Sequence, residues 1–195
     1  MGDERECGGI DDDGSFERDR LRAMPDDRFE QERQRLGVSP SPDSKPGGLG
    51  VVQFMAMCPG NAAQILARAK EVLAVVSESS VPWPTPAEWR KKLPRWFVDR
   101  CAPAMTQEQA EKWLASWREL PPAERDRAEK EKPWSLGDWL YWMEPSNRPW
   151  TWWDGCDQDA NTLALTIEVR DWPFPWGSFR WLVIASGAEN VEAEK

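Results

Sequence analysis

Three aspartates, Asp154, Asp157 and Asp159, lie close together and are the first residues whose types and spacing could bind a metal ion. Carboxylate oxygens are the ligands that Ca²⁺ and Mg²⁺ prefer. The spacing matches no EF-hand loop, which needs D-x-[DN]-x-[DN]-G and a glutamate at its twelfth position. Asp, Gly and Asn are also the residues that a hairpin turn uses. Because turn chemistry accounts for the whole segment 154–161, we interpret it as a turn and expect no metal or other cofactor.

Two glutamates, Glu144 and Glu168, are candidates for a carboxylate pair of the glycosidase type. A groove lined by Trp would suit a sugar, because indole faces stack on the apolar faces of sugar rings. We expect Glu144 to end a helix and Glu168 to point outward from a strand, so a solvated position explains both better. The chain has no histidine, which excludes Ser-His-Asp and Cys-His catalysis and histidine metal ligands. We therefore predict no catalytic residues.

The four cysteines form no CxxC pair, so the sequence predicts neither a zinc site nor a thioredoxin-like motif. They are Cys7, Cys58, Cys101 and Cys156. Cys58 comes just before a predicted helix N-terminus, where the helix dipole would favour a thiolate. It has no histidine partner and lies in an apolar stretch, so we interpret it as a small buried hydrophobic residue. Scattered, reduced thiols fit a cytoplasmic protein.

Tryptophan is the most unusual feature of the composition, with 14 Trp against one Tyr and six Phe. Helical spacing places Trp89, Trp113, Trp117 and Trp139 on faces that we expect to pack in the core. Five others are clustered too densely for one buried face: Trp142, Trp150, Trp153, Trp172 and Trp176. Trp is enriched at binding hot spots, which predicts an interaction surface at these five residues. The alternative is a Trp-rich core with partly exposed edges, because Trp is rarely fully buried.

The distribution of charge divides the chain. Residues 1–46 hold 13 acidic and 8 basic side chains and no Trp, and the segment ends in Ser- and Pro-rich linker chemistry. A segment with so few apolar residues cannot bury enough apolar surface to offset the entropy lost when it becomes ordered. We therefore expect a disordered charged arm with at most a transient helix over 16–36. Residues 47–188 carry every Trp and should form one globular domain. Residues 189–195 should be a polar tail.

Most of the predicted domain is helical. Apolar spacing and capping signals predict helices at 61–77, after Thr85, after Thr106 and at 135–143. Residues 123–132 have no apolar face and should be an exposed helix or a loop. Residues 49–57 are apolar on nearly all sides; we expect a buried helical segment there and keep a strand as the alternative.

The pattern changes after residue 148. Leu163, Leu165, Ile167 and Val169 alternate with more polar residues, a period typical of a strand, and the aromatic run at 150–153 is a partner strand. Two strands alone are marginal in water, so their apolar face must pack on helices. The last helix, 176–186, ends at Gly187. The predicted fold is α+β and mostly helical, with helices packed over a C-terminal β-hairpin and a final returning helix.

The C-terminal part also resembles a known group of sequences. The segments Trp150–Asp154 (WTWWD), Asp171–Gly177 (DWPFPWG), Arg180–Leu182 (RWL) and Ala185–Ala188 (ASGA) resemble a WxWWD, W-P-F, W-L-x-x-A-x-G-A layout. This layout is that of a group of uncharacterised actinobacterial proteins. The resemblance covers about 49–188. It implies a high-GC bacterial source and no assigned activity, so no functional residue is carried over.

These observations predict a non-enzymatic cytoplasmic binding module that acts on a protein partner through its Trp-rich surface, in a regulatory or immunity-like role. The net charge of −9 argues against a nucleic-acid partner. The longest apolar stretch is too short to span a bilayer, and the N-terminus lacks a secretory signal, so we expect no membrane association. The alternative is a carboxylate-based enzyme, or a binder of small ligands or carbohydrates, with a Trp-lined cleft.

Overall fold

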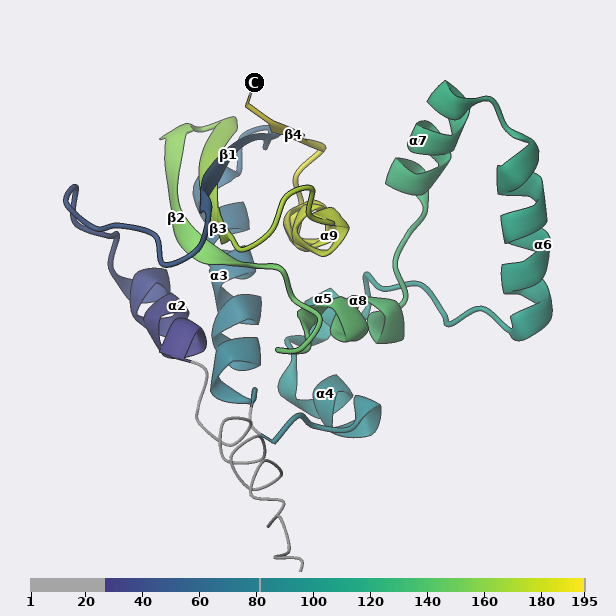
Figure 1. The fold of residues 1–195 in the computed structure, drawn as a ribbon, viewed down its shortest axis with the longest axis horizontal. Helices are drawn as coiled ribbons and strands as arrows, with labels where there is room; N and C mark the ends of the chain where they lie inside the picture. The colour runs from purple at the N-terminus through teal and green to yellow at the C-terminus, as the bar shows by residue number, and fades with distance from the viewer. Residues whose placement is uncertain (1–26, 81, 195) are drawn as a thin grey trace, which may run out of the picture.

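The computed structural model describes residues 27–80 and 82–194, and its centre is a four-stranded antiparallel sheet (Figure 1). The strands are β1 (Gly50–Met57), β2 (Trp150–Asp159), β3 (Thr162–Val169) and β4 (Asn190–Ala193). Their order in the sheet is β2-β3-β1-β4. The predicted β2–β3 hairpin is therefore confirmed, and two further strands complete the sheet.

More of the described residues lie in helices than in strands, which confirms a mostly helical α+β fold. They are α2 (Asp27–Gly37), α3 (Ala62–Glu78), α4 (Pro86–Lys92), α5 (Arg95–Val98), α6 (Gln107–Glu119), α7 (Pro122–Glu131), α8 (Leu136–Met143) and α9 (Gly177–Ser186). Thr85 and Thr106 each form the capping box that the sequence predicts, and each side chain accepts a hydrogen bond from the backbone N–H three residues later. Of the segment 123–132, which the sequence leaves open as helix or loop, residues 123–131 belong to α7 and Lys132 caps its end.

The core lies between one face of the sheet and the helices α3, α8 and α9. The alternating residues of β3, from Leu163 to Val169, are all buried there, as their period predicts. Trp89 and Trp139, which helical spacing assigns to the core, are also fully buried. The final helix α9 ends at Gly187, whose φ of +125° is a conformation that favours glycine.

Residues 49–57 form a strand, not the buried helical segment that we expected. Phe54 and Ala56 are buried in the core, whereas Val51, Gln53 and Met57 are exposed on the other face. Apolar side chains on both faces hide this alternation in the sequence, and a short apolar run does not by itself distinguish helix from strand.

The expected boundaries of the domain at 46/47 and 188/189 are also corrected. Residues 1–26 of the expected disordered arm lie outside the described residues. Residues 27–37 form α2, which packs against α3 and β2. At the other end, residues 190–193 of the expected tail form β4, which pairs with β1 and buries Val191.

A buried ion pair explains how so polar a helix joins the domain. Glu32 on α2 and Arg148, just before β2, are fully buried and form a salt bridge. The Glu32 carboxylate also accepts hydrogen bonds from Ser77 Oγ (2.9 Å) and from the Trp152 backbone N–H (2.6 Å). Burial lowers the pKa of Arg148, and the carboxylate of Glu32 opposes that shift. The helix is therefore held by a buried network of polar contacts to the Glu32 carboxylate, which a count of apolar residues does not detect.

The helices α6 and α7 form a helical hairpin that stands away from the rest of the protein (Figure 1). The sequence predicts that the apolar stripe at Trp113 and Trp117 packs in the core. This prediction is wrong, because no residue of α6 is buried. Cations cover these indoles instead: Lys132 Nζ lies 4.0 Å from the Trp113 ring centre, and the Arg125 guanidinium lies 5.2 Å from that of Trp117. We call residues 107–131 the α6–α7 hairpin and the remaining described residues the body.

Candidate functional site

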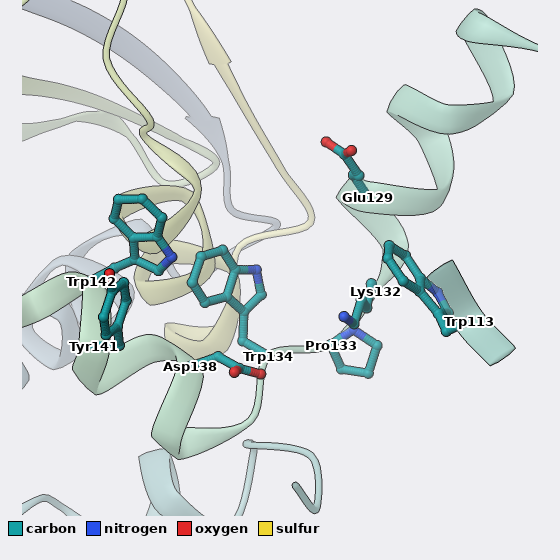
Figure 2. A pocket seen from close by; sticks show the side chains of 8 residues that line it. All are labelled: Trp113, Glu129, Lys132, Pro133, Trp134, Asp138, Tyr141 and Trp142. Carbon is teal, nitrogen blue, oxygen red and sulfur yellow. The ribbon is translucent and has the colours of Figure 1, made fainter. Parts of the chain in front are cut away.

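Two adjoining hollows lie where the α6–α7 hairpin faces the body, with volumes of about 360 and 400 Å³. Trp134, Trp142 and Glu129 line both hollows. Trp113 lines only the first, and Trp176 lines only the second. We call the two hollows together the Trp cleft, named for Trp113, Trp134, Trp142 and Trp176. Figure 2 shows Trp134 and Trp142 on the side of the body, with Trp113 and Lys132 across from them on the hairpin side.

Helix α8 positions Trp142. Ser135 caps this helix: its Oγ accepts a hydrogen bond from the Asp138 backbone N–H (3.1 Å) and donates one to the Asp138 carboxylate (2.8 Å). Leu136, Trp139, Leu140 and Met143 face the core, as predicted. Trp142 lies outside this buried stripe, half-buried, and its ring meets that of Tyr141 edge to face at 5.5 Å.

Trp134 is held by close contact with the start of α9. A Cβ atom on Gly177 would lie 2.8 Å from Trp134 Cζ2, so only glycine leaves room for this indole. The Trp134 carbonyl accepts a hydrogen bond from the Ala102 backbone N–H (2.9 Å). Trp176 precedes Gly177, is half-buried, and places its ring 5.1 Å from that of Phe54. The body therefore anchors these two indoles at the edge of its core.

The indole N–H groups of the Trp cleft are unpaired within the described part of the chain. There, the indoles that donate hydrogen bonds to protein atoms are those of Trp96, Trp139 and Trp150. A buried indole usually finds an acceptor. The unpaired N–H groups of Trp89, Trp117, Trp152 and Trp181 are enclosed, whereas those of the four cleft indoles are not, so a bound molecule can reach the donors of the cleft.

A single side-chain hydrogen bond links the hairpin to the body next to the second hollow. Arg180 on α9 donates from Nη1 to the Lys130 carbonyl on α7 (2.8 Å). Burial lowers the pKa of Arg180, and among residues 27–80 and 82–194 it has no carboxylate partner. A guanidinium that is partly desolvated without a counter-ion favours a ligand with an anionic group.

The structure brings two of the five predicted interaction residues, Trp142 and Trp176, into the Trp cleft. Trp172 is 71 % exposed and lies outside the lining, although its ring is 5.7 Å from that of Phe174, which lines the second hollow. The sequence places Trp113 in the core, which the structure corrects, and it predicts no position for Trp134. The only local signal for Trp134 is its place between a charged helix and the cap at Ser135.

Trp150 and Trp153 are buried, which corrects their expected place on an interaction surface. Trp150 is 1 % exposed and donates its indole hydrogen bond to Ser178 Oγ (3.1 Å). Trp153 is 8 % exposed and lies under the Arg35 guanidinium, 4.0 Å from its ring centre. Trp150 is buried against α9, where its ring also meets that of Phe179. Trp153 is covered by α2, which packs against β2 and which the sequence places in the disordered arm.

The three aspartates do not form the turn that we expected. Strand β2 continues through Asp159, with register shifts at Trp152/Asp154 and at Asp157/Asp159, so only 160–161 form the turn. Asp154 accepts a hydrogen bond from Ser39 Oγ (2.9 Å), and Asp159 accepts one from the Asn161 backbone N–H (2.7 Å). Within the described residues, no group of three or more Cys, Asp or Glu side chains could hold a metal ion.

The two candidate glutamates do not meet in the cleft. Glu144 caps the end of α8 and is half-buried. Glu168 is buried, not solvated as expected: it accepts hydrogen bonds from Arg35 (2.8 Å) and from the Gly48 backbone N–H (2.7 Å). Helix α2 and the loop that follows it cover this part of the sheet and supply both donors.

Cys58 is a small buried side chain, as the sequence indicates. It has no exposed surface, its Sγ lies 3.6 Å from the Ala56 carbonyl, and burial raises the pKa of its thiol. Burial thus opposes the effect of the nearby helix N-terminus and lowers the thiolate fraction of Cys58.

Comparison with protein-family models, with curated proteins and with solved structures finds no match. Over the residues that the structure describes, no helix is long and apolar enough to cross a membrane. The geometry of the Trp cleft is therefore the feature that bears on function.

Proposed function

We propose that this chain is a non-enzymatic cytoplasmic binding module that holds a segment of a protein partner in the Trp cleft, in a regulatory or immunity-like role. The observation that carries the proposal is the convergence of four indoles, with unpaired N–H donors, around one open cleft. They come from α6, α8 and the segments that precede α8 and α9. Trp is enriched among the few residues that carry most of the binding energy of protein interfaces.

The surroundings of the cleft support binding over catalysis. The carboxylates among its lining residues are those of Glu129 and Asp138, and both residues are exposed. Asp138 already accepts a hydrogen bond at the start of α8. A general acid or base gains its altered pKa from burial or from a close charged partner. These two side chains have neither feature, so the carboxylate-enzyme alternative has no support in the cleft.

Charge and cysteine chemistry favour a protein partner in the cytoplasm. The net charge of −9 opposes binding to a nucleic acid. Cys58, Cys101 and Cys156 are unpaired thiols, as expected in a reducing compartment. A carbohydrate is the competing ligand class, because sugars also stack on indoles.

A matched pair on one helix tests the proposal. Trp113 and Trp117 are both half-buried on α6, their rings stack at 6.3 Å, and only Trp113 lines the cleft. The full-length chain and its Trp113→Ala and Trp117→Ala variants are used to capture partners from native lysate, with quantitative mass spectrometry as the readout. We expect Trp113→Ala to lose the specific partner, because removing a hot-spot Trp costs about 2 kcal/mol or more, or about 30-fold in affinity. Trp117→Ala should retain it.

Equal recovery from both folded variants and the unchanged chain would refute a protein-binding role for the cleft. Circular dichroism confirms the fold of each variant. Neither Trp packs in the core of the body, so both variants should fold.

A further inference from the structure

The side chains of the Trp cleft offer more hydrogen-bond donors than acceptors. Donors come from the four unpaired indoles and from Lys130, Lys132 and Arg180. The acceptor carboxylates are those of Glu129 and Asp138, and Asp138 is already engaged with Ser135. An occupant that matches this cleft offers many acceptors and few donors.

Aromatic and proline rings form much of the wall of the Trp cleft. Trp134 and Trp142 lie where the two hollows meet, and Pro133 and Pro175 add apolar surface on either side. Two adjoining hollows around a shared pair of indoles can take successive rigid side chains of one extended ligand. Aromatic-lined grooves of this kind recognise proline-rich segments in the polyproline II conformation.

A polyproline II segment has the matching chemistry. Its backbone makes no internal hydrogen bonds, so its carbonyls remain free to accept from indole N–H groups. Proline has no backbone N–H, so the segment brings few donors that would lose their partners on binding. An α-helix uses its carbonyls internally, and sugar hydroxyls donate as well as accept, so both fit this set of groups less well.

We propose that the Trp cleft binds a proline-rich segment in the polyproline II conformation that carries an acidic side chain beside its prolines, at the end of the cleft formed by Arg180 and Lys130. The acidic group supplies the carboxylate that Arg180 lacks among the described residues. This inference rests on the proposed function, because it names the chemistry of the partner segment that the cleft holds.

Indole N–H resonances of the full-length chain labelled with ¹⁵N test this inference directly. The cleft resonances are assigned by replacing Trp113, Trp134, Trp142 and Trp176 one at a time with Phe. The probe is the blocked peptide Pro-Pro-Glu-Pro-Pro-Glu-Pro-Pro, and the control is Gly-Ser-Glu-Gly-Ser-Glu-Gly-Ser, which has the same length and charge. We expect the proline peptide to shift the four cleft resonances and to leave those of the buried Trp89 and Trp152, which line neither hollow, unchanged.

Two variants locate the binding. Gly177→Ala pushes Trp134 out of its place without removing an indole, because the added Cβ would lie 2.8 Å from that ring. We expect it to weaken proline-peptide binding at least fivefold. Arg180→Gln should remove the preference for the Glu peptide over Pro-Pro-Gln-Pro-Pro-Gln-Pro-Pro. If Gly177→Ala does not fold, Trp142→Phe serves in its place, since the side chain of Trp142 lies outside the buried stripe of α8.

Three results would overturn the inference. The first is no shift of the cleft resonances at about 5 mM proline peptide, a concentration at which a ligand with a Kd of about 1 mM fills most sites. The second is equal shifts from the Gly-Ser peptide. The third is a response to cellohexaose without a response to the proline peptide. If capture of a partner still depends on Trp113 in such a case, the proposed function stands and only the chemistry of the segment is wrong.

Discussion

Replacing Glu32 with alanine should strongly destabilise the fold. The Glu32 carboxylate has no exposed surface and accepts hydrogen bonds from Ser77, from the Trp152 backbone and from Arg148. The variant leaves a buried guanidinium without its counter-ion. Removing one partner of a buried pair costs about 3–5 kcal/mol, and a domain has about 5–15 kcal/mol in total. The measurement is urea unfolding followed by circular dichroism.

Two controls separate the ion pair from the helix as such. Glu30→Ala removes an exposed charge that pairs with Arg33 on the same helix, and it should cost less than about 0.5 kcal/mol. The double variant Glu32→Leu with Arg148→Met buries no charge and should recover much of the lost stability. A Glu32→Ala variant as stable as Glu30→Ala would show that α2 is not docked on β2, and the corrected domain boundary would then be wrong.

Three further predictions concern packing, thiol chemistry and the α6–α7 hairpin. Gly48→Ala should cost about 1–3 kcal/mol in urea unfolding, because its Cβ would clash with the Val169 carbonyl oxygen; an unchanged midpoint would contradict this packing. Burial raises the pKa of Cys101 from 9.0 to about 11, so its thiolate fraction at pH 8 is about a hundredfold lower than usual. Iodoacetamide should therefore label exposed Cys156 first, and labelling of Cys101 should keep rising with pH up to about 11; similar rates at pH 8 would be the contrary result. Thr106→Ala removes a helix cap worth about 1 kcal/mol, so hydrogen exchange of α6 should quicken about fivefold while the body is unaffected; faster exchange throughout would show that the hairpin is not independent.

Local patterns predicted the elements that depend on local chemistry. The alternation from Leu163 to Val169 identified a strand, and the caps at Thr85, Thr106 and Ser135 identified helix starts, because each signal acts over a few neighbouring residues. The strand at 50–57 was mistaken for a helix because its outward residues, Gln53 apart, are also apolar. Its place in the sheet depends on β3 and β4, which lie more than a hundred residues later in the sequence.

The candidate site depends on contacts that only the folded chain makes. Trp142 and Trp176 were identified because they are surplus to one buried face, and both line the cleft. Trp113 was assigned to the core because its helical stripe is apolar, whereas Lys132 covers that indole and the hairpin leaves it at the cleft. Trp153 was placed on the surface because Arg35, which covers it, lies in the segment expected to be disordered.

The affinity of an isolated partner for two single variants tests the central claim most directly. Trp142 lies where the two hollows meet, whereas Trp172 is far more exposed and lies outside their lining. Isothermal titration should show about 30-fold weaker binding for Trp142→Ala and nearly unchanged binding for Trp172→Ala. The opposite order, with Trp172→Ala weakened and Trp142→Ala unchanged, would show that the partner binds an exposed Trp surface and not the Trp cleft.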